Sequence, residues 1–204
     1  REQERAAARL EALATKAHLQ SLQARLNPHF LFNALNSVSA LIADEPKAAE
    51  DSVERLAGLL RYSLADVEGT VSLDQEWAFT LDYLEMEALR LGDRLTIETA
   101  LAPETMACRL PPFALQALVE NAIRHGVAPL PEGGTISVTS SLTDGALRLE
   151  VVDDGAGANS ADASQSDGTG LRDLRARLAG EYGAGAELRA SMAPGPSCGR
   201  VWRR

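Results

Sequence analysis

The sequence predicts an α+β protein in which a helical hairpin precedes an α/β sandwich. Residues 1–42 contain no glycine and are rich in Ala, Leu, Glu, Gln and Arg, a composition that favours a long helix. Pro46 then interrupts the helical pattern. From Gly69 onward, strand-like and helix-like runs follow one another without strict alternation, which disfavours a doubly wound sheet.

Composition limits the classes of function. The 204 residues are 45% hydrophobic and 24% charged, values typical of a soluble globular chain of one or two domains. The formal net charge of -9 disfavours binding to nucleic acid through a basic surface, so we expect no such partner. Cys108 and Cys198 are far apart and form no CxxC or Cys/His cluster, which fits a reducing cytosol.

No apolar run approaches the roughly 20 residues of a membrane span, and no signal peptide opens the sequence. We therefore expect a cytoplasmic location. Because the sequence begins at Arg1 rather than Met, a membrane anchor could precede it in a longer parent chain.

The predicted hairpin occupies residues 1–68. Its first helix runs to about residue 42 and its second from about Lys47 to Leu64, with Asp44-Glu45-Pro46 between them. Apolar stripes follow helical spacing at Leu10, Leu13, Ala17, Gln20 and Ala24 in the first helix and at Val53, Leu56, Leu60 and Leu64 in the second. A two-helix hairpin buries only one side of each helix, so we expect a dimeric four-helix bundle.

Residues 69–204 form the predicted sandwich. Ser72 and Gln75 match a capping box that opens a helix through Leu91, with Trp77, Leu81, Leu84 and Leu89 as its apolar residues. Strands are expected at 95–100, 134–142, 146–152, 186–192 and 199–203, and helices at 112–125 and 170–181. The small polar residues of 158–167 predict a mobile lid.

The segment Asn27-Pro28-His29-Phe30-Leu31-Phe32-Asn33 is the first candidate for chemistry. His29 could be a plain surface histidine beside an apolar core segment. Alternatively, its imidazole is a nucleophile toward a phosphoryl donor, and Asn33, one turn later on the same face, hydrogen-bonds the ring or an attacking water.

The second candidate is Leu118 to Gly126, on the helix that begins after Pro111-Pro112. Asn121 offers an uncharged oxygen of the kind that Mg²⁺ with a triphosphate accepts, and Arg124 lies one turn on to meet phosphate oxygens. The alternative is an amphipathic helix that ends at a glycine.

Two glycine-rich turns complete the set. Asp153 ends an apolar strand, where its carboxylate could accept an adenine amino proton while Gly155 and Gly157 let the backbone approach a flat base. The alternative is an ordinary turn. Gly168-Thr169-Gly170-Leu171 opens a helix whose N-terminal amides could receive phosphates, a weak signal by itself.

With these motifs in this order, the chain from about residue 19 onward resembles the catalytic core of LytS/YehU-type sensor histidine kinases. The segments that carry the resemblance are NPHFLFN at 27–33, Leu60-Arg61-Tyr62, Tyr83-Leu84 and LVENAIRHG at 118–126. The resemblance implies a Bergerat (GHKL) nucleotide domain, ATP and Mg²⁺ as cofactors, a homodimer, a response-regulator receiver domain as partner and a sensor domain upstream in the parent chain.

The resemblance also implies the roles of individual residues. His29 would be phosphorylated with Asn33 beside it, and Asn121 would be the magnesium ligand. The implied nucleotide-binding residues are Asn121, Arg124, His125, Asp153, Gly155, Gly157, Gly168, Thr169, Gly170 and Leu171.

The sequence departs from related patterns at three places. Phe30 stands where many histidine kinases have an acidic residue, so no base for the imidazole is evident nearby in sequence. Ala117 stands where gyrase-like ATPases have the glutamate that activates water, which disfavours rapid hydrolysis. Residues 195–200 match the family's ending loosely, which puts the last strand in question. The alternatives are an ATP-binding dimeric scaffold without transfer and a GHKL ATPase clamp.

Overall fold

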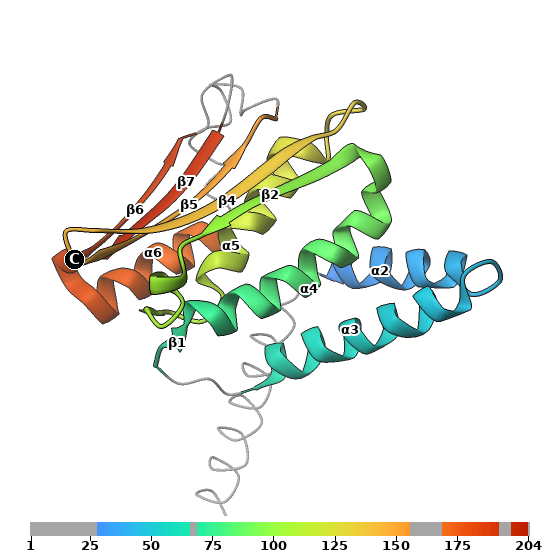
Figure 1. The fold of residues 1–204 in the computed structure, drawn as a ribbon, viewed down its shortest axis with the longest axis horizontal. Helices are drawn as coiled ribbons and strands as arrows, with labels where there is room; N and C mark the ends of the chain where they lie inside the picture. Colours follow the sequence, from blue (N-terminus) through green and yellow to red (C-terminus); the bar gives the residue numbers. More distant parts are fainter. Residues whose placement is uncertain (1–27, 66–68, 156–168, 192–196, 204) are drawn as a thin grey trace, which may run out of the picture. The chain divides into compact units, whose positions relative to one another are not determined.

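The computed structural model describes residues 28–65, 69–155, 169–191 and 197–203 (Figure 1). The chain divides into two compact units, Arg1–Asp66 and Val67–Arg204, close to the limits that the sequence predicts. The larger part of the first predicted helix, residues 1–27, and the predicted lid lie outside the described residues.

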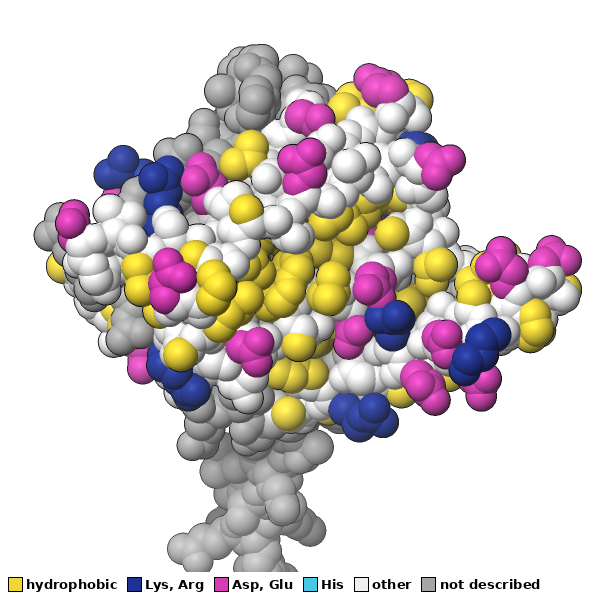
Figure 2. Space-filling view, in the orientation of Figure 1, with side chains coloured by type: hydrophobic (Ala, Val, Ile, Leu, Met, Phe, Trp, Pro, Cys, Tyr) yellow, Lys and Arg dark blue, Asp and Glu magenta, His cyan; other side chains and the backbone are white. Residues whose placement is uncertain are grey.

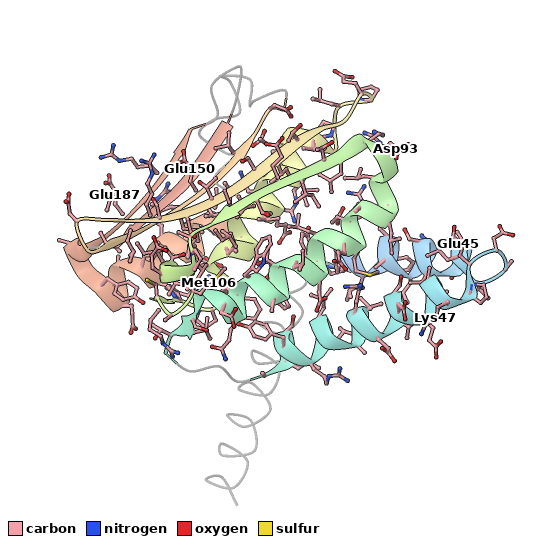
Figure 3. The ribbon with its side chains drawn as sticks, viewed as in Figure 1. Glu45, Lys47, Asp93, Met106, Glu150 and Glu187 are labelled. Carbon is pink, nitrogen blue, oxygen red and sulfur yellow. The ribbon has the colours of Figure 1, made fainter. Side chains whose placement is uncertain are left out.

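The first unit contains the predicted helical hairpin. Helix α2 spans Pro28–Leu41 and helix α3 spans Pro46–Leu64. Pro46 occupies the first turn of α3, where its missing N–H costs no helical hydrogen bond. Glu45 and Lys47 flank this proline at the tip of the hairpin (Figure 3), and the Lys47 ammonium lies 3.0 Å from the Asp51 carboxylate.

The apolar residues of α3 include both buried and exposed side chains. Leu56 and Leu59 are buried, whereas Val53, Leu60 and Leu64 are exposed. The four residues of the predicted stripe keep the helical spacing that places them on one face of α3, but only Leu56 among them is buried. The large exposed hydrophobic residues of the other helix are Phe32 and Leu35, and Ile42 follows just after its end. Hydrophobic side chains reach the surface of the hairpin between charged ones (Figure 2).

The second unit opens with the predicted capping box. Helix α4 spans Leu73–Leu91, the Gln75 amide N–H donates to Ser72 Oγ at 3.2 Å, and the Ser72 amide donates to Gln75 Oε1 at 3.1 Å. Of the apolar residues that the sequence places on this helix, Leu84 is fully buried and Leu89 is 41% exposed. The buried side of α4 is instead completed by Phe79, Tyr83 and Met86.

A five-stranded sheet has the order β2-β4-β5-β7-β6. Its strands are β2 (Leu95–Leu101), β4 (Gly134–Thr143), β5 (Ala146–Asp153), β6 (Ala186–Ser191) and β7 (Ser197–Arg203). Strands β2 and β4 are parallel, and the other neighbours are antiparallel. Every predicted strand is present, including β7, which pairs with both β5 and β6.

Short elements join these strands to three helices. Strands β1 (Val71–Ser72) and β3 (Arg109–Leu110) pair as a small antiparallel ribbon that the sequence did not predict. Short 3-10 turns occupy Gly92–Arg94, Pro103–Thr105 and Gly183–Gly185. Helices α5 (Ala114–Asn121) and α6 (Thr169–Tyr182) lie with α4 on one face of the sheet (Figure 1). This two-layer arrangement confirms the predicted α+β class.

Alternation along β5 directs its side chains to the two faces of the sheet. Leu149 and Val151 are buried on the helix side, whereas Arg148 and Glu150 form a 3.1 Å ion pair on the opposite side (Figure 3). Asp153 continues the inward series and is 5% exposed. The period of the strand therefore places this carboxylate under the helices.

Across the described ranges, no helix is both long and apolar enough to cross a membrane.

Candidate functional site

His29 lies on the exposed surface of α2, in its first turn. The Asn33 side-chain amide nitrogen is 3.2 Å from His29 Nδ1 and 3.4 Å from Nε2. The spacing of four residues brings the two side chains together on one helical face. Phe30 is buried, so the first aromatic residue of the motif anchors α2 while the imidazole faces outward.

A buried carboxylate from α4 holds the N-terminus of α5. Helix α5 lacks a side-chain cap of its own, because Phe113 at the N-cap has no side-chain acceptor; its backbone is left-handed with φ of 62°. Glu76, which is fully buried, accepts hydrogen bonds from the amides of Phe113 at 2.6 Å and Leu115 at 3.1 Å. A negative charge there also complements the positive end of the helix. Glu76 thus fixes where the helix bearing Asn121 begins.

Helix α6 is tied to the same point. The Arg177 guanidinium donates to the carbonyl oxygen of Pro112, immediately before α5. The hydroxyl of Tyr182, at the end of α6, lies 3.4 Å from the carbonyl oxygen of Arg109. These contacts fix α6 along the segment that leads into α5.

The sequence predicts a helix over residues 112–125. In the structure the α-helix that carries Asn121 ends at that residue. After α5, residues Ala122–Val127 form a π-helical segment, η3, and the Ala128 amide donates to the Ile123 carbonyl five residues earlier at 2.8 Å. Single π turns inside helices are frequent at functional sites. Asn121 lies at the junction between α5 and this wider turn and is half-buried.

The π segment packs against the end of β5 without room for any additional atom. A Cβ at Gly126 would lie 2.2 Å from Asp153 Oδ1, and a Cβ at Gly155 would lie 2.4 Å from the backbone of Gly126. The Gly155 amide donates to Asp153 Oδ1 at 3.2 Å. The structure therefore brings the Asn121 helix and the Asp153 turn together, although 32 residues separate the two side chains in sequence.

The neighbouring carboxylate, Asp154, has a different environment. Asp154 Oδ1 accepts a hydrogen bond from the Thr135 amide at 2.6 Å, and the Asp154 amide donates to the Thr135 carbonyl at 3.2 Å. This pair of bonds joins the end of β5 to the start of β4. Asp154 is exposed and structural, whereas Asp153 is buried next to the π segment.

The second glycine turn reaches the same helix. A Cβ at Gly170 would lie 4.0 Å from the Ala117 Cβ, so the start of α6 contacts α5 one turn before Asn121. Leu171 is buried at this junction. Gly157, Gly168 and the lid lie outside the described residues, and only the backbone of Thr169 is described.

Charges surround the end of the π segment. Arg124 pairs with Glu120 one turn earlier. Partial burial lowers the pKa of His125 from its ordinary 6.5, the Arg124 charge lowers this pKa further, and the Asp153 carboxylate opposes both effects. Arg124, His125 and Asp153 therefore share one electrostatic environment, and the Glu120 carboxylate holds Arg124 in it.

Sequence reasoning found the residues at the ends of elements but missed those that position them. Glu76 and Arg177 act across 37 and 65 residues of sequence. No local pattern signals such partners. The one available hint is that Glu76 lies on the buried side of α4, which also contains Thr80 and Glu87 among its apolar residues.

The described residues fit a magnesium-nucleotide better than a metal alone. Within the described part of the chain, no group of three or more His, Cys, Asp or Glu residues could hold a metal ion. Mg²⁺ usually takes one or two protein oxygens and completes its shell with phosphates and water. A half-buried Asn121 supplies one such oxygen at the junction of α5 and η3.

Comparison with known proteins adds independent support. The histidine kinase family matches residues 17–95. The sensor histidine kinase YpdA of Escherichia coli (strain K12) is 34% identical over 192 residues, which cover 90% of this chain and 34% of YpdA. The sensor protein LytS of Staphylococcus haemolyticus (strain JCSC1435) is 33% identical over 187 residues, which cover 86% of this chain and 32% of LytS. The chain thus spans about a third of the length of these curated relatives.

Solved structures agree at the level of the fold. The histidine kinase domain of the blue-light activated kinase EL346 from Erythrobacter litoralis has a TM-score of 0.51 at 18% identity, covering 95% of this chain and 93% of that chain. Full-length ShkA, described in complex with AMPPNP, has a TM-score of 0.50 at 18% identity and covers 95% of this chain and 45% of that chain. Taken with the sequence matches, these likenesses show that the chain belongs to the histidine kinase family, among the sensor kinases of the LytS type.

Proposed function

We propose that this chain is the catalytic core of a two-component sensor kinase that transfers the γ-phosphoryl group of ATP to His29 and then to an aspartate of a response regulator. The observation that supports it most is the packing of Gly126, Asp153 and Gly155, which joins the Asn121 helix to the Asp153 turn. Together with Gly170 beside Ala117, this packing supports a single site that draws on three separate sequence motifs.

On the acceptor side, the neutral imidazole of His29 attacks the γ-phosphorus with the lone pair of one ring nitrogen. A nitrogen–phosphorus bond forms, the bond from phosphorus to the bridging oxygen breaks, and ADP leaves. The other ring nitrogen then loses its proton to solvent. Asn33 lies beside both ring nitrogens and orients the ring through its amide, which can donate to a bare nitrogen or accept from a protonated one.

On the nucleotide side, Asp153 would accept a hydrogen bond from the adenine amino group. Gly155 keeps the end of β5 packed against the backbone of Gly126, which holds Asp153 in place. Asn121 would hold Mg²⁺, which supplies neutralisation of phosphate charge when bound. Gly170 and Leu171 would place the N-terminal amides of α6 near the phosphates. Catalysis then consists mainly of positioning and charge neutralisation.

The partners follow from the same assignment. Exposed apolar residues on both helices of the hairpin support a homodimer through this unit. A receiver domain would approach His29 on the exposed face of α2. A sensor domain and a membrane anchor would belong to the remainder of a longer parent chain, since the curated relatives are about three times as long as the matched region.

The test is incubation with γ-labelled ATP and Mg²⁺, followed by treatment of the protein with acid or alkali. We expect label that survives alkali and is lost in acid, as phosphohistidine requires. His29→Ala should abolish this label, and His18→Gln, which removes a histidine from the same region of sequence, should retain it. ATP binding without any label would instead favour a scaffold that does not transfer.

The position of Ala117 argues against an ATPase clamp as the second candidate. Its methyl group lies against Gly170, on the face of α5 that carries Asn121, and cannot take a proton from water. We expect phosphate release to be slower than phosphoryl transfer. Steady phosphate release from the His29→Ala variant at the rate of the unaltered protein would contradict this expectation.

A further inference from the structure

Five ionisable side chains gather where α4 packs beside α5 and η3. Tyr83, Glu87 and Arg90 come from α4, and Glu120 and Arg124 come from α5 and η3. Each carboxylate has a guanidinium of its own. Arg90 donates to Glu87 Oε2 through Nε at 2.9 Å and Nη2 at 2.5 Å, and Arg124 pairs with Glu120.

Tyr83 places both ion pairs in one electrostatic environment. Its side chain is 4% exposed, and burial raises the pKa of the phenol well above its ordinary value. The carboxylates of Glu87 and Glu120 raise this pKa further, whereas Arg124 and Arg90 lower it. Two negative and two positive charges therefore balance around a buried phenol.

Arg124 differs from Arg90 in its freedom to move. The side chain of Arg124 is 46% exposed and that of its partner Glu120 is 24% exposed. In the other ion pair, the side chain of Arg90 is 28% exposed and that of Glu87 is 5% exposed. Arg124 lies in η3, three residues after Asn121, and pairs with Glu120, the residue before Asn121. This partly exposed guanidinium, close to Asn121 in the chain, is the cation available to a phosphate group bound beside Asn121.

We propose that Glu120 is a positioning residue that holds Arg124 and competes with the phosphates of a bound nucleotide for it. This inference rests on the proposed function, because it requires a nucleotide beside Asn121. Nucleotide binding then exchanges one ion pair, Arg124 with Glu120, for another, Arg124 with phosphate. Glu120 thereby lowers the affinity for nucleotides and keeps Arg124 directed in the empty site.

The cluster explains why this exchange carries a cost. When Arg124 moves to a phosphate, two carboxylates, Glu120 and Glu87, stay near the buried Tyr83. Arg90, which pairs with Glu87, is then the one guanidinium of this cluster that still balances them. Like charges near a buried group repel each other more strongly than they do in water. Removing the charge of Glu120 removes both the competition for Arg124 and this repulsion.

The test compares the affinities of MgATP and adenosine for the full chain by isothermal titration calorimetry. Glu120→Gln should tighten MgATP binding about twofold to fivefold, the range expected for a partly exposed ion pair. It should leave adenosine binding unchanged, because adenosine has no phosphates. Glu120→Asp, which shortens the reach toward Arg124, should tighten MgATP binding by a smaller factor. Glu54→Gln, an exposed site on α3, makes the same change of net charge and should have no effect.

The Arg124→Met variant makes the test specific. It should bind MgATP more weakly, and adding Glu120→Gln to it should change the affinity no further. Weaker or unchanged MgATP binding by Glu120→Gln would overturn the inference, as would equal changes for MgATP and adenosine, which indicate a structural role. If the unaltered chain binds no MgATP, the proposed function fails first. If it binds MgATP and Glu120→Gln has no effect, this inference alone fails.

Discussion

Gly126 has no space for a side chain. A methyl group there would lie 2.2 Å from Oδ1 of the buried Asp153, so either the π segment or the carboxylate must move. We predict that Gly126→Ala weakens ATP binding about tenfold or more, because overpacking of this size typically costs 1–3 kcal/mol. Titration with a fluorescent ATP analogue measures the effect.

Gly180 in α6 is the matched control. It has nothing within 4 Å of the position that a Cβ would take. Gly180→Ala should therefore keep full nucleotide affinity and stabilise the fold by up to about 1 kcal/mol, the usual difference between these residues in a helix. Equal affinities for Gly126→Ala and Gly180→Ala would show that the contact between the π segment and Asp153 does not form the binding site.

His125 should make stability depend on pH in one direction. Its folded-state pKa is lowered from 6.5 by partial burial and by Arg124. As the pH falls through 6.5, the unfolded chain takes up the proton first, so the folded chain loses stability. We predict that the stability advantage of the unaltered chain over His125→Gln is larger at pH 8 than at pH 5. Urea unfolding across this range measures the difference, and parallel curves would contradict the prediction.

Among the elements, α5 depends most on a neighbour. Its first amides are held by the buried carboxylate of Glu76 on α4. We predict that Glu76→Gln lowers the free energy of unfolding by about 1–3 kcal/mol, since one acceptor becomes a donor that faces an N–H. Urea denaturation followed by tryptophan fluorescence reports on this unit, because Trp77 and Trp202 both belong to it.

Asp74 provides the comparison on the same helix. It lies in the first turn of α4 and is exposed. Asp74→Asn removes a carboxylate as Glu76→Gln does, but should cost only a few tenths of a kcal/mol through the helix dipole. A loss for Asp74→Asn as large as for Glu76→Gln would show that the cap on α5 adds nothing specific.

Long elements with a regular hydrophobic pattern were predictable from the sequence. Elements that are very short, or that depend on contacts distant in sequence, were not. Strand β5 alternates over eight residues and α4 opens with a capping box, so both carry strong local signals. The ribbon of β1 and β3 has two residues in each strand, too few to show any alternation. The π turn of η3 depends on how its backbone packs against β5, which no sequence period encodes.

The candidate site divides in the same way. The places of Asn121, Asp153, Gly155 and Gly170 in the fold were predictable because each lies at or next to the end of an element with a recognisable sequence; their roles in the site stay predictions. Glu120 precedes Arg124 by four residues, so their ion pair could have been predicted from helical spacing. The sequence prediction assigned Arg124 to phosphate alone. Glu76 and Arg177 required the three-dimensional packing of α4 and α6 around α5.

For the molecule as a whole, the hairpin should provide the dimer interface. Val53 is 52% exposed and Leu64 is 59% exposed, on the same helix as the buried Leu59. We predict that Leu64→Glu shifts the protein from dimer to monomer in sedimentation equilibrium, because a charge in an apolar interface stays solvated only in the monomer. Leu142→Glu, at a similarly apolar exposed position in β4, should leave the dimer intact. Dissociation by Leu142→Glu alone would place the interface in the other unit.

The central claim is that the nucleotide held beside Asn121 phosphorylates His29. The most direct measurement is to locate the phosphoryl group by mass spectrometry, under conditions that preserve phosphohistidine, after the full chain has been incubated with MgATP. The account predicts phosphate on His29 in the unaltered chain and none on any residue of the Asn121→Ala variant. Phosphate on another residue, or phosphorylation of His29 that persists in Asn121→Ala, would contradict it.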